Sequence, residues 1–264
     1  IWELDEFAFN TVAPKIKPEV VLFLNVSRDQ LDRYGEIDKV VNRWCDSVSK
    51  LDPQTTVLIN RDDPNLAKLK NFFKGIKEFE KPKNIKLRGL NGSSFEIKKL
   101  KINLPMPGIY NINNAAAAIS AANYLKLAIS SLTNFQGAFG RVEKLPFGYI
   151  FLIKNPAGVT AVFETIAPQI KEADRLLLAL NDNLADGTDV SWIWDAEFEI
   201  FRTTSRAKPR EYTIFTSGTR AYDLAVRLKY AGFDPKSIAV ESDLKNALRE
   251  AQRGLKGRLF ILPT

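Results

Sequence analysis

The 264-residue sequence predicts an α/β protein with two consecutive domains, residues 1–144 and 145–264. Short apolar runs alternate with segments of helical spacing in both halves, an order typical of parallel sheets with crossover helices. The length suits one large or two ordinary domains. The composition, 45% hydrophobic and 26% charged, is that of a globular protein, and no apolar run is long enough for a membrane-spanning helix.

In the first half, residues 20–25 (VVLFLN) and 56–60 (TVLIN) are predicted strands, with a helix between them at 37–49. Residues 68–104 are rich in Lys, Gly and Asn, and their short alternating pieces predict antiparallel strands or an insertion. An alanine-rich helix follows at 108–127. Its small side chains allow close packing against a sheet.

The second half predicts a doubly wound, Rossmann-like sheet. A turn, KNPAG, is predicted at 154–158. The expected strands cover residues 149–153, 175–180, 212–216, 238–240 and 259–262. The expected helices cover residues 159–173, 224–230 and 244–252.

Two residue counts exclude several kinds of site. The single cysteine, Cys45, excludes an internal disulfide and a cysteine-cluster zinc site, and its place in a helix predicts a buried structural thiol. The sequence has no histidine, so it cannot complete a Ser-His-Asp triad or a Cys-His dyad alone. A catalytic histidine oriented by an acid of this chain must therefore belong to another protein. The net charge of +7 predicts a solvated basic face, and no motif indicates a nucleic-acid site.

Polar clusters follow five of the predicted strands, beginning at Asn25, Asn60, Lys154, Asn181 and Thr216. Ligands of open α/β sheets bind beyond the carboxyl ends of the strands, so the five together predict a bound polar ligand. Each cluster alone is equally well explained as a turn or a helix N-cap.

The stretch from 179 to 199, ALNDNLADGTDVSWIWDAEFE, holds six acidic residues and two tryptophans. Asp186 and Asp189 surround Gly187 and can be turn residues. Trp192 and Trp194 lie two apart in a strand-like run, so we expect them to share one face, either in the core or against a partner protein.

Two further groups have both a simple and a functional interpretation. Glu3, Asp5 and Glu6 can form a solvated acidic edge or a site for Mg²⁺. Asn111 and Asn114 can cap the helix that starts near them, or bind a planar heterocycle through their amides.

In chain order, several of these motifs resemble Mur ligases. The central ATPase domain of that family is matched by ELDE from Glu3, NVSRDQLDRYG at 25–35, NRDDP at 60–64, GIYNINNAAAA at 108–118 and GRVE at 140–143. The C-terminal domain of the MurT subgroup is matched by KNPAG, DNLADGTDVSWIWDAEFE at 182–199 and SGTRAYDLAVRLKYAGF at 217–233. The resemblance implies a partial Mur ligase central domain followed by a Rossmann-like Mur ligase C-terminal domain.

The resemblance also implies an activity, a glutamine-hydrolysing carbon–nitrogen ligase of peptidoglycan synthesis. ATP with Mg²⁺ would activate the α-carboxyl of D-Glu in the lipid II stem peptide as an acyl phosphate. Ammonia from a GatD-like class I glutaminase subunit would then give D-isoglutamine. The implied location is the cytoplasm, at the inner face of the membrane.

Site residues follow from the same resemblance. Glu3 matches the magnesium-binding glutamate, and Gln30 stands where most Mur ligases have a metal-binding histidine. The residues implied at ATP are Asn111 and Asn114 near the adenine, Arg141 at the nucleotide, and Lys154 and Asn155 where the C-terminal domain closes.

Asp195 matches the aspartate that serves, in the MurT subgroup, as the third member of a glutaminase triad. The cysteine and histidine of that triad belong to the partner, GatD. This role agrees with the absence of histidine here, and Asp186 and Asp189 are the competing candidates for it.

Two features depart from the family pattern. The glycine-rich GxxGKT/S phosphate loop lies upstream of Glu3 in the family and is absent here, and both ends of the sequence read as cuts through a longer protein. We therefore expect no ATPase activity from this chain alone. MurT proteins commonly carry a four-cysteine zinc ribbon, but residues 64–101 contain no cysteine, so zinc is not expected.

Two alternatives stay open. One is a Mur-type or folylpolyglutamate-type ligase that adds an amino acid, against which the SWIWD stretch and Gln30 argue. The other is a non-catalytic scaffold, which predicts no nucleotide binding.

Overall fold

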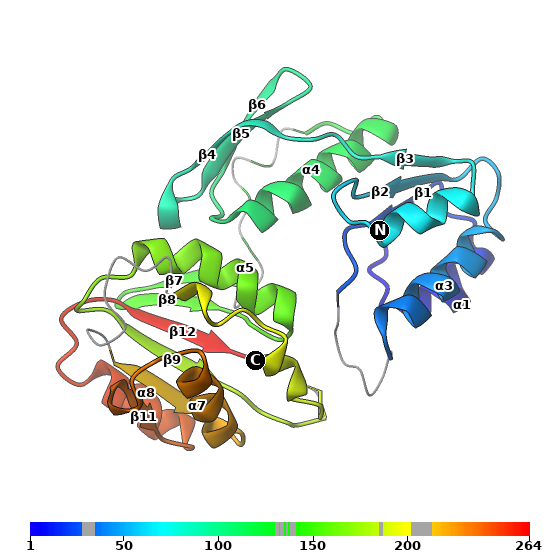
Figure 1. Ribbon diagram of the computed structural model, residues 1–264. Helices are drawn as coiled ribbons and strands as arrows, with labels where there is room; N and C mark the ends of the chain where they lie inside the picture. The colour runs from blue at the N-terminus through cyan, green and yellow to red at the C-terminus, as the bar shows by residue number, and fades with distance from the viewer. Residues whose placement is uncertain are drawn as a thin grey trace. The chain divides into compact units, whose positions relative to one another are not determined.

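A computed structural model describes residues 1–27, 35–129, 132, 135, 137, 141–184, 187–201 and 213–264, with only the backbone of Arg141. The chain forms two compact units (Figure 1). The first contains Ile1–Lys86, Ser94–Leu104 and Tyr110–Asn134. The second contains Leu87–Ser93, Pro105–Ile109 and Phe135–Thr264. None of the helices in these described ranges is long and apolar enough to cross a membrane.

The first unit is built on a parallel sheet of β1 (Val20–Phe23), β2 (Thr56–Ile59) and β3 (Ile76–Glu78), in that order. Apolar residues of β1 and β2 pack in one core with α1 (Ala8–Ile16), α3 (Ile37–Val48) and the 3₁₀ helix η1 (Leu66–Asn71). The predicted strands and the helix between them are confirmed. Helix α1 was not predicted, and β3 pairs parallel with β2 although its segment suggested antiparallel strands.

Polar contacts at the start of the chain hold α1 on α3. The Asp5 carboxylate accepts hydrogen bonds from the backbone N–H groups of Phe7 (3.0 Å) and Ala8 (2.6 Å), as an N-terminal cap does. The Trp44 indole N–H donates to the Glu6 carbonyl at 3.0 Å. Beside Trp44, Cys45 is buried, and this burial raises the pKa of its thiol. The prediction of a buried structural cysteine is confirmed.

A second sheet of the chain has the order β4 (Lys83–Leu87), β5 (Ser93–Ile97) and β6 (Leu100–Leu104), with the short η2 (Gly89–Asn91) between its first two strands. Lys98 and Lys99 join β5 to β6, and both have positive φ, 45° and 70°. A two-residue connection with positive φ at both positions is a type I′ hairpin turn. The prediction of antiparallel strands is therefore right for this hairpin.

The second unit has a six-stranded sheet of order β11-β10-β9-β12-β8-β7. Its strands are β7 (Arg141–Leu145), β8 (Gly148–Phe151), β9 (Arg175–Ala179), β10 (Ile214–Ser217), β11 (Ile238–Val240) and β12 (Leu259–Pro263). Only the pair β7 and β8 is antiparallel, and the others are parallel. Among the described residues that follow β8, the helical segments include α5 (Pro156–Ile166), η4 (Ala167–Gln169), η5 (Ser191–Trp194), α7 (Ala221–Tyr230), η6 (Pro235–Ser237) and α8 (Leu244–Gln252).

Helices cover both faces of this sheet. Alternate residues of a strand point to opposite faces, so neighbouring residues of β9 pack against different helices. Leu176 and Leu178 of β9 pack in one cluster with residues of α5 and α7. Leu177, between them, packs in another cluster with Ala247 and Ala251 of α8. The doubly wound arrangement expected for this half is confirmed.

Two boundaries in this unit differ from the predictions. The predicted turn at 154–158 is instead the start of α5, with Asn155 as its N-cap and Pro156 in its first turn. The helix expected to reach residue 173 ends at Ile166 and continues only as η4. Pro168 lacks the N–H group that an α-helix would need at that point.

Candidate functional site

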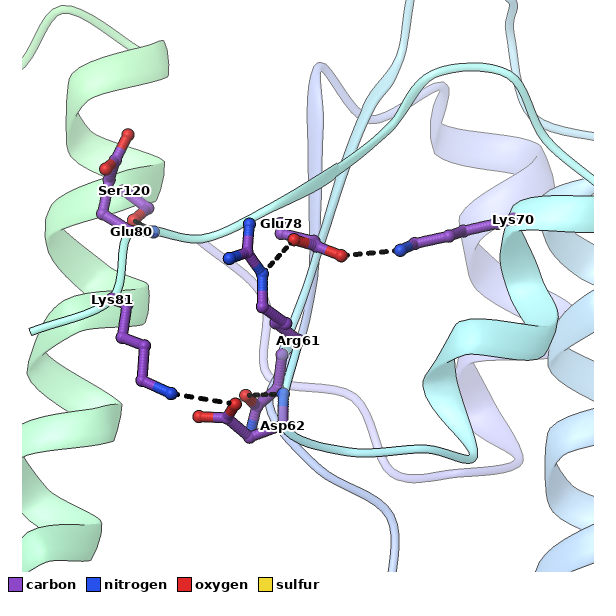
Figure 2. Close-up of polar contacts among 8 residues, drawn as sticks. Arg61, Asp62, Lys70, Glu78, Glu80, Lys81 and Ser120 are labelled. Atoms are coloured by element: carbon purple, nitrogen blue, oxygen red, sulfur yellow. Dashed lines mark hydrogen bonds and ion pairs between the residues drawn. The ribbon is translucent and has the colours of Figure 1, made fainter.

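The carboxyl ends of β2 and β3 carry a network of charged side chains in the first unit (Figure 2). Glu78 accepts a hydrogen bond from Lys70 Nζ at 2.6 Å and another from Arg61 Nε. Lys81 Nζ lies 3.3 Å from the Asp62 carboxylate. The bond from Lys70, and after it the bond from Arg61, lowers the pKa of Glu78. The Glu78 carboxylate is therefore ionised at neutral pH, where it pairs with both cations.

The NRDDP cluster after β2 forms turns and ties two loops together. Asn60 Oδ1 accepts from Asp62 N at 3.0 Å, and Asp63 Oδ1 accepts from Asn65 N at 2.9 Å, as in Asx-turns. The second oxygen of Asp63 accepts from Val26 N, beyond the end of β1, at 2.7 Å. These contacts confirm the turn interpretation and fix the edge of the sheet where ligands of parallel sheets bind.

Ser120 joins the chain beyond β3 to the helix α4 (Ile109–Tyr124). Its hydroxyl accepts from Glu80 N at 3.0 Å (Figure 2). It also donates to the Ala116 carbonyl at 2.8 Å. Ala115, Ala116 and Ala117 are buried in this helix. Three consecutive small side chains of this helix are thus buried, as the close packing expected for it requires.

The predicted magnesium ligand, Glu3, is exposed and precedes α1. Its neighbour Asp5 serves the helix cap described above, which favours the structural interpretation for that carboxylate. Among the residues with described positions, no group of three or more His, Cys, Asp or Glu side chains could hold a metal ion. Gln30 lies outside the described residues, and the roles of Glu3 and Gln30 stay predictions.

Asn111 and Asn114 lie inside α4, as its third and sixth residues. Neither residue precedes the helix, so helix capping does not explain the pair. Asn111 is buried and Asn114 is exposed, one turn further along the same side. Their amides remain candidates for binding a heterocycle.

Arg141 is the first residue of β7 and lies in register with Phe151 of β8. Its side chain is outside the described part of the structure, so its predicted contact with a nucleotide stays a prediction.

Lys154 and Asn155 follow β8 at the carboxyl edge of the six-stranded sheet. Asn155 Oδ1 accepts a hydrogen bond from Gly158 N at 2.7 Å, which confirms an N-cap. Lys154 is exposed immediately before this helix end. The exposed ammonium group and the N-terminus of α5 both favour an anion here.

The loops after β9 and β10 are locked to each other at the same edge. Thr219 Oγ1 donates to Asp182 Oδ1 at 2.7 Å, and Thr219 N donates to Asn181 Oδ1 at 3.2 Å. Gly218 has φ +92°, and a Cβ there would lie 2.3 Å from the Leu180 carbonyl oxygen. Only glycine therefore fits between the two loops.

The expectation that Trp192 and Trp194 share a face is wrong. They lie in η5, a 3₁₀ helix with about three residues per turn, so residues two apart point in different directions. Trp192 is buried in the core of the second unit. Trp194 is 52% exposed, with its ring edge-on to that of Tyr230 at 5.7 Å.

Asp195 directly follows η5 as its C-cap and is exposed. Its backbone N–H donates to the Trp192 carbonyl at 3.0 Å. Of its two competitors, Asp189 accepts from Ser191 N at 2.8 Å, which agrees with a turn residue. Asp186 lies outside the described residues.

Beneath Asp195 lies Arg227 of α7, whose side chain is only 5% exposed. Its Nε donates to the Ile193 carbonyl at 2.9 Å, and its Nη2 donates to the Ala196 carbonyl at 2.8 Å. Nη1 and Nη2 also donate to the two Glu199 carboxylate oxygens, each at 2.9 Å. These bonds from Arg227 lower the pKa of Glu199.

The sequence analysis did not single out Arg227, although a signal was present. Arg227 lies between Leu224 and Leu228 on the helix side that faces the core. A charged residue on the buried side of an amphipathic helix requires a buried hydrogen-bonding partner.

An exposed apolar surface adjoins Asp195. Tyr222, Val226 and Tyr230 are spaced four apart on α7, all three exposed, and Tyr230 contacts Trp194. Residues four apart lie on one side of a helix, so the four side chains form one stripe. Exposed aromatic groups of this kind mark protein interaction surfaces.

Two family models match most of the chain. The Mur ligase middle domain matches residues 3–122, and the MurT ligase C-terminal domain matches residues 152–264. The chain belongs to the Mur ligase family. It combines the middle domain of that family with a C-terminal domain of the MurT type.

Similar proteins agree with this family. The MurT subunit of lipid II isoglutaminyl synthase (glutamine-hydrolyzing) from Streptococcus pneumoniae is 29% identical, across 100% of this chain and 71% of its own. Among solved structures, MurF from Acinetobacter baumannii superposes with a TM-score of 0.73 at 17% identity, covering 97% of this chain and 59% of its own. Folylpolyglutamate synthase from Mycobacterium tuberculosis, complexed with ADP, superposes with a TM-score of 0.69 at 16% identity, covering 94% of this chain and 61% of its own. The chain thus spans about three fifths of these two solved structures.

Proposed function

We propose that this chain is part of the synthetase subunit of a glutamine-dependent, ATP-driven amidotransferase of peptidoglycan synthesis. The match of residues 152–264 to the MurT ligase C-terminal domain carries this proposal. The reaction is amidation of the D-Glu α-carboxyl of the lipid II stem peptide to D-isoglutamine. The expected boundary at 144/145 lies between the two family matches but inside β7 (Arg141–Leu145), which pairs within the sheet of the second unit, so we propose that the boundary precedes β7.

For the nucleotide, we propose Asn111 and Asn114 at the adenine and Arg141 and Lys154 toward the phosphates. The amides on α4 and the exposed ammonium of Lys154 are groups that fit such a ligand. The Asn155 side-chain oxygen is occupied by the N-cap, so its contribution is to hold the N-terminus of α5 in place. ATP supplies the phosphoryl group that activates a carboxylate.

For magnesium, Glu3 offers one exposed carboxylate. Mg²⁺ in phosphoryl-transfer sites is commonly held by one or two carboxylates together with substrate phosphates and water, and a single glutamate fits that pattern. Since the sequence has no GxxGKT/S loop, we expect this 264-residue chain to show no ATP hydrolysis.

For glutamine hydrolysis, we propose that Asp195 orients the catalytic histidine of a GatD-like class I glutaminase. Such an aspartate sets the tautomer and orientation of the imidazole. The exposure of Asp195, the apolar stripe beside it and the absence of histidine in this chain all support a site shared with a partner.

The test is reconstitution of this chain with a GatD-like glutaminase, followed by size-exclusion chromatography and an assay of ammonia release from glutamine. We expect a stable complex that hydrolyses glutamine faster than the glutaminase alone. Two proteins that elute separately, with no change in ammonia release, would rule the proposal out. Asp189→Asn is a matched control in the same stretch, and its complex should behave as the wild type.

A further inference from the structure

We infer that Arg227 is a positioning residue for Asp195, acting through the backbone on either side of it. Its guanidinium binds the carbonyl groups of Ile193 and Ala196, which bracket Asp195 in the chain. The inference rests on the proposed role of Asp195 in the partner's glutaminase site. It adds a residue of this chain that contacts neither glutamine nor the partner's nucleophile.

The segment around Asp195 depends on side chains for its shape. It consists of one 3₁₀ turn followed by an irregular stretch, which contains no strand pairing. Ile193, Ala196 and Phe198 are buried and anchor the segment in the core. The carbonyl groups of Ile193 and Ala196 receive charge-assisted hydrogen bonds there, which are stronger than neutral ones.

The geometry of Arg227 suits this task and that of lysine does not. The guanidinium makes four hydrogen bonds in different directions from one plane, two to carbonyl groups and two to Glu199. The rings of Phe198 and Trp194 lie 4.9 Å and 5.6 Å from its central carbon. A lysine ammonium is a single point charge and cannot reproduce a bidentate fork with two further donors.

Position matters for the role proposed for Asp195. A carboxylate that orients a histidine works by holding it at hydrogen-bond distance in one tautomer. Displacement of a catalytic group by about 1 Å can cost about a hundredfold in rate. Loss of the Arg227 contacts should therefore lower glutamine hydrolysis without removing any group that touches the substrate.

The test is a double-mutant cycle in the reconstituted complex, with wild type, Arg227→Lys, Asp195→Asn and the double variant. We expect Arg227→Lys to lower kcat for glutamine about tenfold to a hundredfold, with KM unchanged. In the Asp195→Asn background the same substitution should have no further effect, because residues that act as a unit are not additive. Equal losses in both backgrounds, or an unchanged kcat in Arg227→Lys, would overturn the inference.

Arg258→Lys is the matched control. Arg258 also bonds a buried carboxylate, Asp174 (2.6 Å), and a backbone carbonyl, that of Gln169. Arg258 and Asp174 directly precede β12 and β9, whereas Asp195 follows η5. Arg258→Lys should lower the melting temperature and leave kcat unchanged.

A second variant covers the case in which Arg227→Lys does not fold. Glu199→Gln keeps the buried arginine and weakens only the bidentate pair, and we expect a smaller loss of kcat that again vanishes with Asp195→Asn. No loss in Glu199→Gln, with Arg227→Lys unfolded, would overturn the inference. If Asp195→Asn itself leaves kcat unchanged in an intact complex, the proposed triad fails and the inference fails with it. If Asp195→Asn lowers kcat but Arg227→Lys causes equal losses in both backgrounds, only the inference fails.

Discussion

Two regions of the molecule pair basic side chains with carboxylates, one beyond β2 and β3 and the other around Arg227, and they differ in how far the basic side chains are buried. In the first unit, Arg61 and Lys70 both bind the Glu78 carboxylate, and the two cations are roughly half exposed or more. In the second unit, Arg227 is buried, and its guanidinium donates to the carbonyls of Ile193 and Ala196 and to the Glu199 carboxylate. The first arrangement is a solvated network of charges, whereas the second builds one charge into the core to shape a surface segment.

The difference teaches where charge is expected to matter for the fold. Exposed ion pairs contribute little, because water and salt screen them and the side chains lose entropy. A buried arginine without its partners leaves polar groups unsatisfied in a medium of low dielectric constant. The two regions should therefore respond very differently to single substitutions.

The largest expected effect is that of Arg227→Met. This change leaves the carbonyl groups of Ile193 and Ala196 without their donor, and breaking such a buried arrangement costs about 3–5 kcal/mol. Urea unfolding followed by tryptophan fluorescence, to which Trp192 and Trp194 contribute, measures it. A loss of unfolding free energy below about 1 kcal/mol would mean that Arg227 stabilises the fold no more than an exposed ion pair does.

Next in size is the N-cap of α5. Asn155→Ala removes the acceptor for Gly158 N and should cost about 1 kcal/mol of unfolding free energy. Asn155→Asp keeps a capping oxygen and should stay close to wild type. Equal losses in the two variants would show that the cap is not the stabilising feature.

Glu199→Gln should have a smaller effect, one that depends on pH. The Glu199 side chain is 55% exposed, so we expect about 1 kcal/mol or less at neutral pH. Its folded-state pKa lies below the ordinary value of 4.5, so the ion pair stabilises the fold above that value and loses its effect as pH falls through the folded pKa. Urea midpoints for both proteins should converge in acid, and a gap that persists there would contradict this account.

The smallest expected effect is that of Glu78→Gln. Its neighbours are exposed cations, and its pKa is lowered chiefly by the hydrogen bond from Lys70. We expect only a slight change in urea midpoint at neutral pH, shrinking further at high salt because exposed pairs are screened. A change as large as that of Arg227→Met would remove the contrast between the two regions.

The sequence predicted the six-stranded sheet of the second unit well, because the apolar runs and the helical spacing in that half are regular. The limits of α8 are those expected, Leu244–Gln252. Helix α1 was missed, since its capping residue Asp5 was interpreted as part of an acidic edge or metal site.

The candidate site was predicted less completely. Asp195 could be named from the family motif, but its setting could not. The SWIW segment packs against α7 as a 3₁₀ turn, although its residues alternate as in a strand. The shared face predicted for the two tryptophans from that alternation was therefore wrong. Arg227 binds the backbone on either side of Asp195 through hydrogen bonds between residues more than thirty apart in the chain, which periodicity does not reveal.

The central proposal is that Asp195 completes the partner's glutaminase site. The most direct measurement is kcat for glutamine hydrolysis by the reconstituted complex with wild-type chain and with Asp195→Asn, after chromatography has shown equal complex formation. Loss of the tautomer-setting carboxylate predicts a fall of about 10²–10⁴-fold. An unchanged kcat in an intact complex would contradict the account.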